Sequence, residues 1–101
     1  MKVYLDDERP TPAGWTGCRW PAEVIELLKT GAVTHLSLDH DLGDDAIGTG
    51  YDVLVWLEEA VHAGLTPPVI TLHTANSAAR LRMQQAVDSI ARLFARNAGP
   101  A

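Results

Sequence analysis

Short apolar runs alternate along the chain with longer segments whose apolar residues recur at helical spacing. The runs predict strands and the longer segments predict helices. The expected strands are residues 2–5, 36–38 and 69–72, with a short edge strand at 18–20, and the expected helices begin at Pro21, after Thr49, and after Asn76 or Ser77. Because the three main runs are continuous rather than alternating, we expect a parallel sheet with both faces covered, in a single domain spanning 1–101.

Local signals set the helix boundaries. Thr49 and Asp52 have the spacing of a partial capping box, and Gly64 ends the helix that they begin. The apolar stripe expected on the last helix is Met83, Val87, Ile90 and Phe94. We expect residues 97–101 to form a frayed tail.

Composition narrows the class of protein. The chain has 101 residues, 47% of them hydrophobic, which is enough for a packed core. Its net charge of −5 argues against binding along duplex nucleic acid. No apolar stretch approaches the ~20 residues of a membrane span, and Met1 leads into a strand rather than a signal peptide. The single cysteine, Cys18, is expected to be a buried filler and suggests a reducing cytoplasm.

Acidic and histidine side chains follow each of the three buried strands. They occur at residues 6–8, at 39–41 and at 73–76. Because the carboxyl ends of parallel strands share one edge of the sheet, we expect these groups to meet in one cleft. Neighbouring carboxylates need a proton or a cation between them, and Mg²⁺ prefers oxygen ligands. His40 and His73 extend the choice to Mn²⁺ or another transition metal.

The same edge carries groups suited to a phosphate. A divalent cation can clamp a phosphoryl oxygen, and a histidine can transfer protons near neutral pH. Free amides at Asn76 and Ser77 and the charge of Arg80 could bind the phosphate itself. Each feature alone also has a structural explanation, since paired acids are common in turns and a lone histidine is more often structural. Their convergence on one edge favours a functional site.

Leu5-Asp6-Asp7, Asp39 and Thr74 resemble the receiver domain of two-component signalling. In that family the paired acids hold Mg²⁺, the central aspartate accepts a phosphoryl group and the hydroxyl contacts it. The resemblance implies that Asp39 is a ligand or a phosphoacceptor and that Thr74 is a phosphate contact. The chain departs from receivers in two places: a proline-rich loop replaces the first helix, and no lysine follows Lys29 where the fifth strand would supply one.

Four motifs together resemble a divergent branch, the cyclic-phosphate processing receiver-like domain. They are LDDERP (5–10), LDHDLG (38–43), TGYD (49–52) and HTAN (73–76). The resemblance covers nearly the whole chain and implies hydrolysis or processing of a cyclic phosphate on a nucleotide or RNA end. The site that it implies is Asp6, Asp7, Asp39, His40, Asp41 and His73, with Asn76 in support.

The predicted fold is a truncated receiver-like (flavodoxin-like) three-layer α/β sandwich. It has about four mostly parallel strands in the order 2-1-3-4, three helices and no fifth strand. The loop before the second strand is barely long enough for a parallel crossover, so antiparallel pairing stays open. The open edge of the fourth strand suggests a homodimer, which light scattering would exclude by showing only monomer at high concentration.

The predicted function is that of a metal-dependent phosphoesterase acting on a cyclic phosphate. The metal ligands are Asp6, Asp7, Asp39 and Asp41; the catalytic residues are Asp39, His40 and His73; the phosphate contacts are Thr74, Asn76, Ser77 and Arg80. The two histidines act as acid and base, or one of them is a ligand. Two other functions stay open, since fold alone does not fix function: a signalling module that accepts a phosphoryl group at Asp39 or binds a phosphate ligand, and a non-catalytic interaction protein of toxin–antitoxin or phage type.

Overall fold

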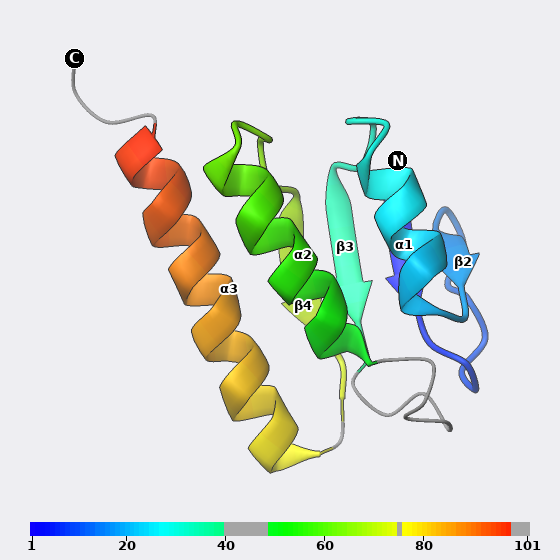
Figure 1. The fold of residues 1–101 in the computed structure, drawn as a ribbon. Helices are drawn as coiled ribbons and strands as arrows, with labels where there is room; N and C mark the ends of the chain where they lie inside the picture. Colours follow the sequence, from blue (N-terminus) through cyan, green and yellow to red (C-terminus); the bar gives the residue numbers. More distant parts are fainter. Residues whose placement is uncertain (40–48, 75, 98–101) are drawn as a thin grey trace.

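The computed structural model describes residues 1–39, 49–74 and 76–97, which form four strands and three helices (Figure 1). The elements are β1 (Lys2–Leu5), β2 (Thr16–Cys18), α1 (Pro21–Leu28), β3 (His35–Leu38), α2 (Gly50–His62), β4 (Val69–Leu72) and α3 (Ser77–Asn97). The sheet has the order β2-β1-β3-β4. Neighbouring strands are parallel throughout, which settles the direction of the second strand. The predicted strand order and the three helices are confirmed.

The short second strand lies two residues earlier than expected. β2 pairs with β1 in a register that sets Cys18 beside Leu5. The next two residues precede α1 and lead into it, because the backbone amides of Arg19 and Trp20 both donate to the carboxylate of Glu23 at 3.1 Å. The side chain of Cys18 is buried as predicted. This burial, together with a smaller effect of the nearby charge of Glu23, raises the pKa of its thiol to about 11.

The three helices lie side by side on one face of the sheet, with α2 between α1 and α3 (Figure 1). Alternate strand residues point into this layer and are fully buried, namely Val3, Leu5, Leu36 and Leu38. Lys2, Tyr4, His35 and Ser37 alternate with them and point to the second face of the sheet.

Helices on both faces, the three-layer arrangement expected from the sequence, are not found among the described residues. The segment that would carry a first helix is a loop, and its Trp15 packs edge-on against Tyr4 with ring centroids 6.2 Å apart. The prediction of two covered faces was wrong because apolar residues in a strand can point to an uncovered face. In β4, Val69 and Thr71 are exposed while Ile70 and Leu72 are partly buried. The fold is therefore a two-layer α/β arrangement over the described part of the chain.

Side chains cap the first turns of α2 and α3. Thr49 and Asp52 form the predicted capping box, since the Thr49 hydroxyl accepts from the Tyr51 amide and the Asp52 carboxylate accepts from the Thr49 amide at 2.7 Å. The side chain of Asn76 accepts from the Ala79 amide at 3.0 Å and caps α3.

The predicted stripe of α3 is confirmed in part. Met83 and Ile90 are buried and Val87 is partly buried against the core. Phe94 remains 37% exposed, because it lies beside an open pocket near the end of α2 rather than under the sheet. Among the described helices, none is long and apolar enough to cross a membrane.

Candidate functional site

The hydrogen-bond ladder of the sheet continues one residue beyond three of its strands and brings their polar ends together. The amide of Asp6 donates to Cys18, the amide of Asp39 donates to Leu5, and the amide of His73 donates to Leu38, at 3.0–3.1 Å. These bonds hold Asp6, Asp39 and His73 in neighbouring positions at the carboxyl edge of the sheet. The predicted meeting of the strand ends is therefore seen for these three residues.

One ligand atom from each of Asp6, Asp39 and His73 lies within 4.8 Å of the others. We call these three residues the strand-edge cluster. The two aspartates are buried, with 6% and 9% of their surface exposed. A cluster of two carboxylates and an imidazole with this spacing is suited to a divalent cation.

The carboxylate of Asp6 is fixed by its own loop. Its Oδ1 atom accepts from the amides of Glu8 at 2.8 Å and Arg9 at 2.9 Å, and its Oδ2 atom lies 3.2 Å from His73 Nε2. Burial by itself would raise the pKa of Asp6, but the two amide hydrogen bonds and His73 outweigh it and leave the pKa lowered. Asp6 is therefore ionised. Its Oδ1 atom is used by the loop, while its Oδ2 atom faces His73 and also lies 3.9 Å from the Nε atom of Arg9.

The imidazole of His73 is held on three sides. Its Nδ1 lies 2.7 Å from the Ser37 hydroxyl, its Nε2 faces Asp6, and its ring stacks on Tyr4 with centroids 4.3 Å apart and an angle of 4° between the planes. Burial lowers the pKa of His73, although the charges of Asp39 and Asp6 oppose this effect. His73 is therefore neutral near pH 7, the form that can bind a metal.

Asp7, a predicted ligand, is not a member of the strand-edge cluster, although it follows Asp6 directly. Its Oδ1 atom is buried and has no hydrogen-bond partner in the part of the chain that the structure describes. A buried carboxylate oxygen without a partner is costly, and a cation would satisfy it. Of the other predicted ligands and catalytic residues, His40 and Asp41 lie outside the described residues.

The predicted phosphate contacts gather at the start of α3. The buried hydroxyl of Thr74 accepts from the Asn76 amide at 3.2 Å, and the side chain of Asn76 is used as the helix cap. Ser77 and Arg80 are exposed on the first turn. Their roles toward a phosphate stay predictions.

Three contacts of the cluster were not anticipated from the sequence, and they involve Arg9, Ser37 and Tyr4. The Nη1 atom of Arg9 donates to the carbonyl of His73 at 2.7 Å, which ties the first loop to the end of β4. The sequence could have pointed to Ser37, because it is a lone polar residue between two buried leucines. Nothing in the sequence distinguished Tyr4, since an aromatic residue is ordinary in a strand.

Gly50 brings the start of α2 against the site. A Cβ atom at this position would overlap the backbone carbonyl oxygen of Asp39 and lie 3.1 Å from Met83 Cε. Only a glycine allows the helix to begin this close to Asp39.

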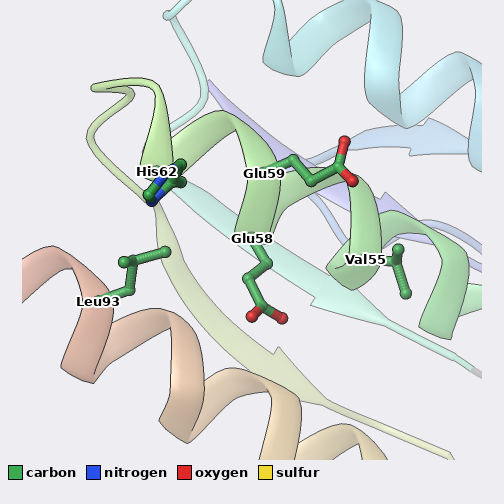
Figure 2. A pocket seen from close by; sticks show the side chains of 5 residues that line it. All are labelled: Val55, Glu58, Glu59, His62 and Leu93. Carbon is green, nitrogen blue, oxygen red and sulfur yellow. The ribbon is translucent and has the colours of Figure 1, made fainter.

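A cavity of about 380 Å³ lies elsewhere, between α2 and α3 (Figure 2). It is lined by Val55, Glu58, Glu59, His62 and Leu93. Figure 2 shows side chains of α2 with Leu93 facing them from α3. None of the strand-edge cluster lines this cavity, so the chemistry of the site belongs to the sheet edge.

The lowered pKa values predict how the stability of the metal-free protein depends on pH. Because His73 is harder to protonate when folded, the unfolded chain takes up this proton first, and stability falls as the pH drops from the ordinary value of 6.5 toward the folded pKa. Asp6 acts with the same sign at more acidic pH, below its ordinary value of 3.8. Urea unfolding at about pH 7.5 and about pH 5.5 should show a larger loss in wild type than in His73→Gln, and equal losses would contradict this assignment.

The comparisons with known proteins agree with this geometry. The family model described as the cyclic-phosphate processing receiver domain matches residues 1–89, a span that includes the whole strand-edge cluster. Searches of the curated proteins and of the solved structures found no match. The chain therefore belongs to the family of cyclic-phosphate processing receiver domains.

Proposed function

We propose that the protein is a metal-dependent phosphoesterase that processes a cyclic phosphate on a nucleotide or an RNA end. The observation that carries the proposal is the strand-edge cluster, whose three ligand atoms lie within 4.8 Å of one another in a chain of this family. The ligand is then a small phosphate ester, which is compatible with the negative net charge because no long phosphate backbone has to be accommodated.

Asp6, Asp39 and His73 would hold a Mg²⁺ or Mn²⁺ ion. Asp7, whose buried Oδ1 atom has no hydrogen-bond partner among the described residues, is proposed as a further ligand. Asp41 is proposed as a further ligand from the sequence. When bound, the divalent cation supplies Lewis acidity toward a phosphoryl oxygen and acidifies a water.

Metal binding, proton transfer and phosphate binding are proposed for different side chains of the protein. One ring nitrogen of His73 contacts Ser37 and the other contacts Asp6, which favours a ligand role for this residue over proton transfer. His40 is then the candidate general acid or base of the sequence prediction. Thr74, Asn76, Ser77 and Arg80 are the proposed phosphate contacts, because the first amides of α3 and a positive charge suit an anion there.

The test is turnover by the purified protein with Mn²⁺ or Mg²⁺. We expect opening of a 2′,3′-cyclic nucleotide or a cyclic-phosphate RNA end to a monoester, dependent on the cation and lowered by more than about 100-fold in Asp39→Ala. Asp88→Asn, at an exposed position of α3, serves as the control and should keep wild-type activity. Absence of turnover with all these substrates would contradict the proposal.

Membership of a receiver family supports a second function, phosphoryl transfer to Asp39 in a signalling module. Labelling with acetyl phosphate separates the two, because only this function predicts stable label that is lost in Asp39→Asn.

Two further features of the proposal concern the state of the protein. We propose a homodimer through the outer edge of β4, where the described sheet ends and Val69 is 59% exposed. We also propose a cytoplasmic location, which a single free and buried cysteine supports.

A further inference from the structure

Ser37 is a buried polar residue whose hydroxyl contacts, within the described part of the chain, one side chain that lies 36 residues further on. It stands on β3 between Leu36 and Leu38 but points to the opposite face of the sheet, and 7% of its surface is exposed. Its hydroxyl oxygen lies 2.7 Å from His73 Nδ1. A hydroxyl in this setting is stabilised by its hydrogen bond, and losing the partner would leave a buried polar atom unsatisfied.

The surroundings of His73 decide which ring nitrogen carries the proton in the metal-free protein. A neutral imidazole has one N–H donor and one acceptor nitrogen. The Asp6 carboxylate accepts from two backbone amides at Oδ1 and faces the ring at Oδ2, so Nε2 carries the proton and donates to Asp6 Oδ2 at 3.2 Å. Nδ1 is then the acceptor, and the Ser37 hydroxyl donates to it.

A cation in the strand-edge cluster requires the opposite arrangement. Nε2 is the nitrogen that faces Asp6, so it must offer its lone pair to the ion, and the proton must sit on Nδ1. The group opposite Nδ1 must then accept a hydrogen bond instead of donating one. A hydroxyl can do either by rotating its hydrogen, whereas a methyl group can do neither.

We infer that Ser37 is a positioning residue that holds His73 in both arrangements and so allows it to become a metal ligand. On binding, one N–H bond is lost at Nε2 and one is formed at Nδ1, with the proton exchanged through solvent and the imidazole neutral throughout. The Ser37 hydroxyl changes from donor to acceptor without moving its oxygen. The inference rests on the proposed cation site and adds a residue to it.

Histidine-labelled protein tests the inference by ¹⁵N NMR with Zn²⁺ as a diamagnetic probe. Metal-free wild type should show the Nε2–H form of His73, and saturation with Zn²⁺ should convert it to the Nδ1–H form. Mn²⁺ affinity measured by titration calorimetry should fall about 10–100-fold in Ser37→Ala, as found for residues that orient metal-bound histidines. Ser37→Thr, which keeps the hydroxyl, should restore it.

Thr71→Ala is the matched control, because Thr71 pairs with Ser37 in the β3–β4 register and is exposed. It should bind both ions like wild type. The same tautomer of His73 before and after Zn²⁺ saturation, or wild-type Mn²⁺ affinity in Ser37→Ala, would overturn the role of Ser37 and leave the cation site intact. A wild-type protein that binds neither ion would overturn the proposed function as well.

Discussion

Asp39→Asn is expected to weaken Mn²⁺ binding by at least about 100-fold while leaving the protein folded. The substitution keeps the shape and one oxygen of the side chain but removes one of the two carboxylate charges of the strand-edge cluster. Two unit charges 4 Å apart interact by about 4 kcal/mol at the effective dielectric near a protein surface, and a divalent ion doubles the charge. A factor of ten corresponds to about 1.4 kcal/mol, so two orders of magnitude is a modest expectation.

The matched control is Asp88→Asn, which makes the same charge change at an exposed site on α3. The carboxylate of Asp88 accepts a hydrogen bond from Gln84 one turn away and has no part in the cluster. Titration calorimetry should give wild-type affinity for this control. Equal losses in the two variants would mean that the ion responds to net charge alone and that Asp39 is no ligand.

Gly50→Ala is expected to destabilise the protein by about 1–3 kcal/mol, the usual cost of forcing extra atoms into a packed site. In most helix positions the same change is favourable by close to 1 kcal/mol, so the sign is diagnostic. Here the added Cβ would overlap the carbonyl oxygen of Asp39 and press on Met83. The melting temperature should fall by about 4–8 °C for each kcal/mol, and displacement of Asp39 should weaken Mn²⁺ binding at the same time.

Gly64→Ala provides the comparison at the other end of α2. An added Cβ there meets no atom within 4 Å, but the backbone φ of +113° is strained for any other residue. This variant should lose stability without losing affinity for Mn²⁺. If Gly50→Ala stabilised the protein, the close approach of α2 to Asp39 would be wrong.

The parts of the fold that local chemistry determines were predictable from the sequence. Thr49 and Asp52 mark a helix start by their own spacing, and the run Val69–Leu72 was predicted with the bounds that β4 has. The position of β2 was not, because Glu23 draws Arg19 and Trp20 into a helix cap, and this contact competes with strand pairing. The one-sided helical layer was also missed, since apolar residues in short strands do not reveal which face is covered.

The sequence predicted which residues meet at the site, but it did not predict the contacts between their side chains. Parallel strands put Asp6, Asp39 and His73 on one edge whatever their side chains do, and the structure brings them together. The orientation of the His73 ring depends on Ser37 and Tyr4, which come from two other strands. No spacing rule along a single chain connects these residues, so their roles required the three-dimensional arrangement.

Anomalous diffraction from crystals grown with Mn²⁺ tests the central claim most directly. We expect a manganese peak coordinated by Asp6, Asp39 and Nε2 of His73, and loss of that peak in Asp39→Asn. Manganese bound only at other positions, or none at the carboxyl edge of the sheet at saturating concentration, would contradict it.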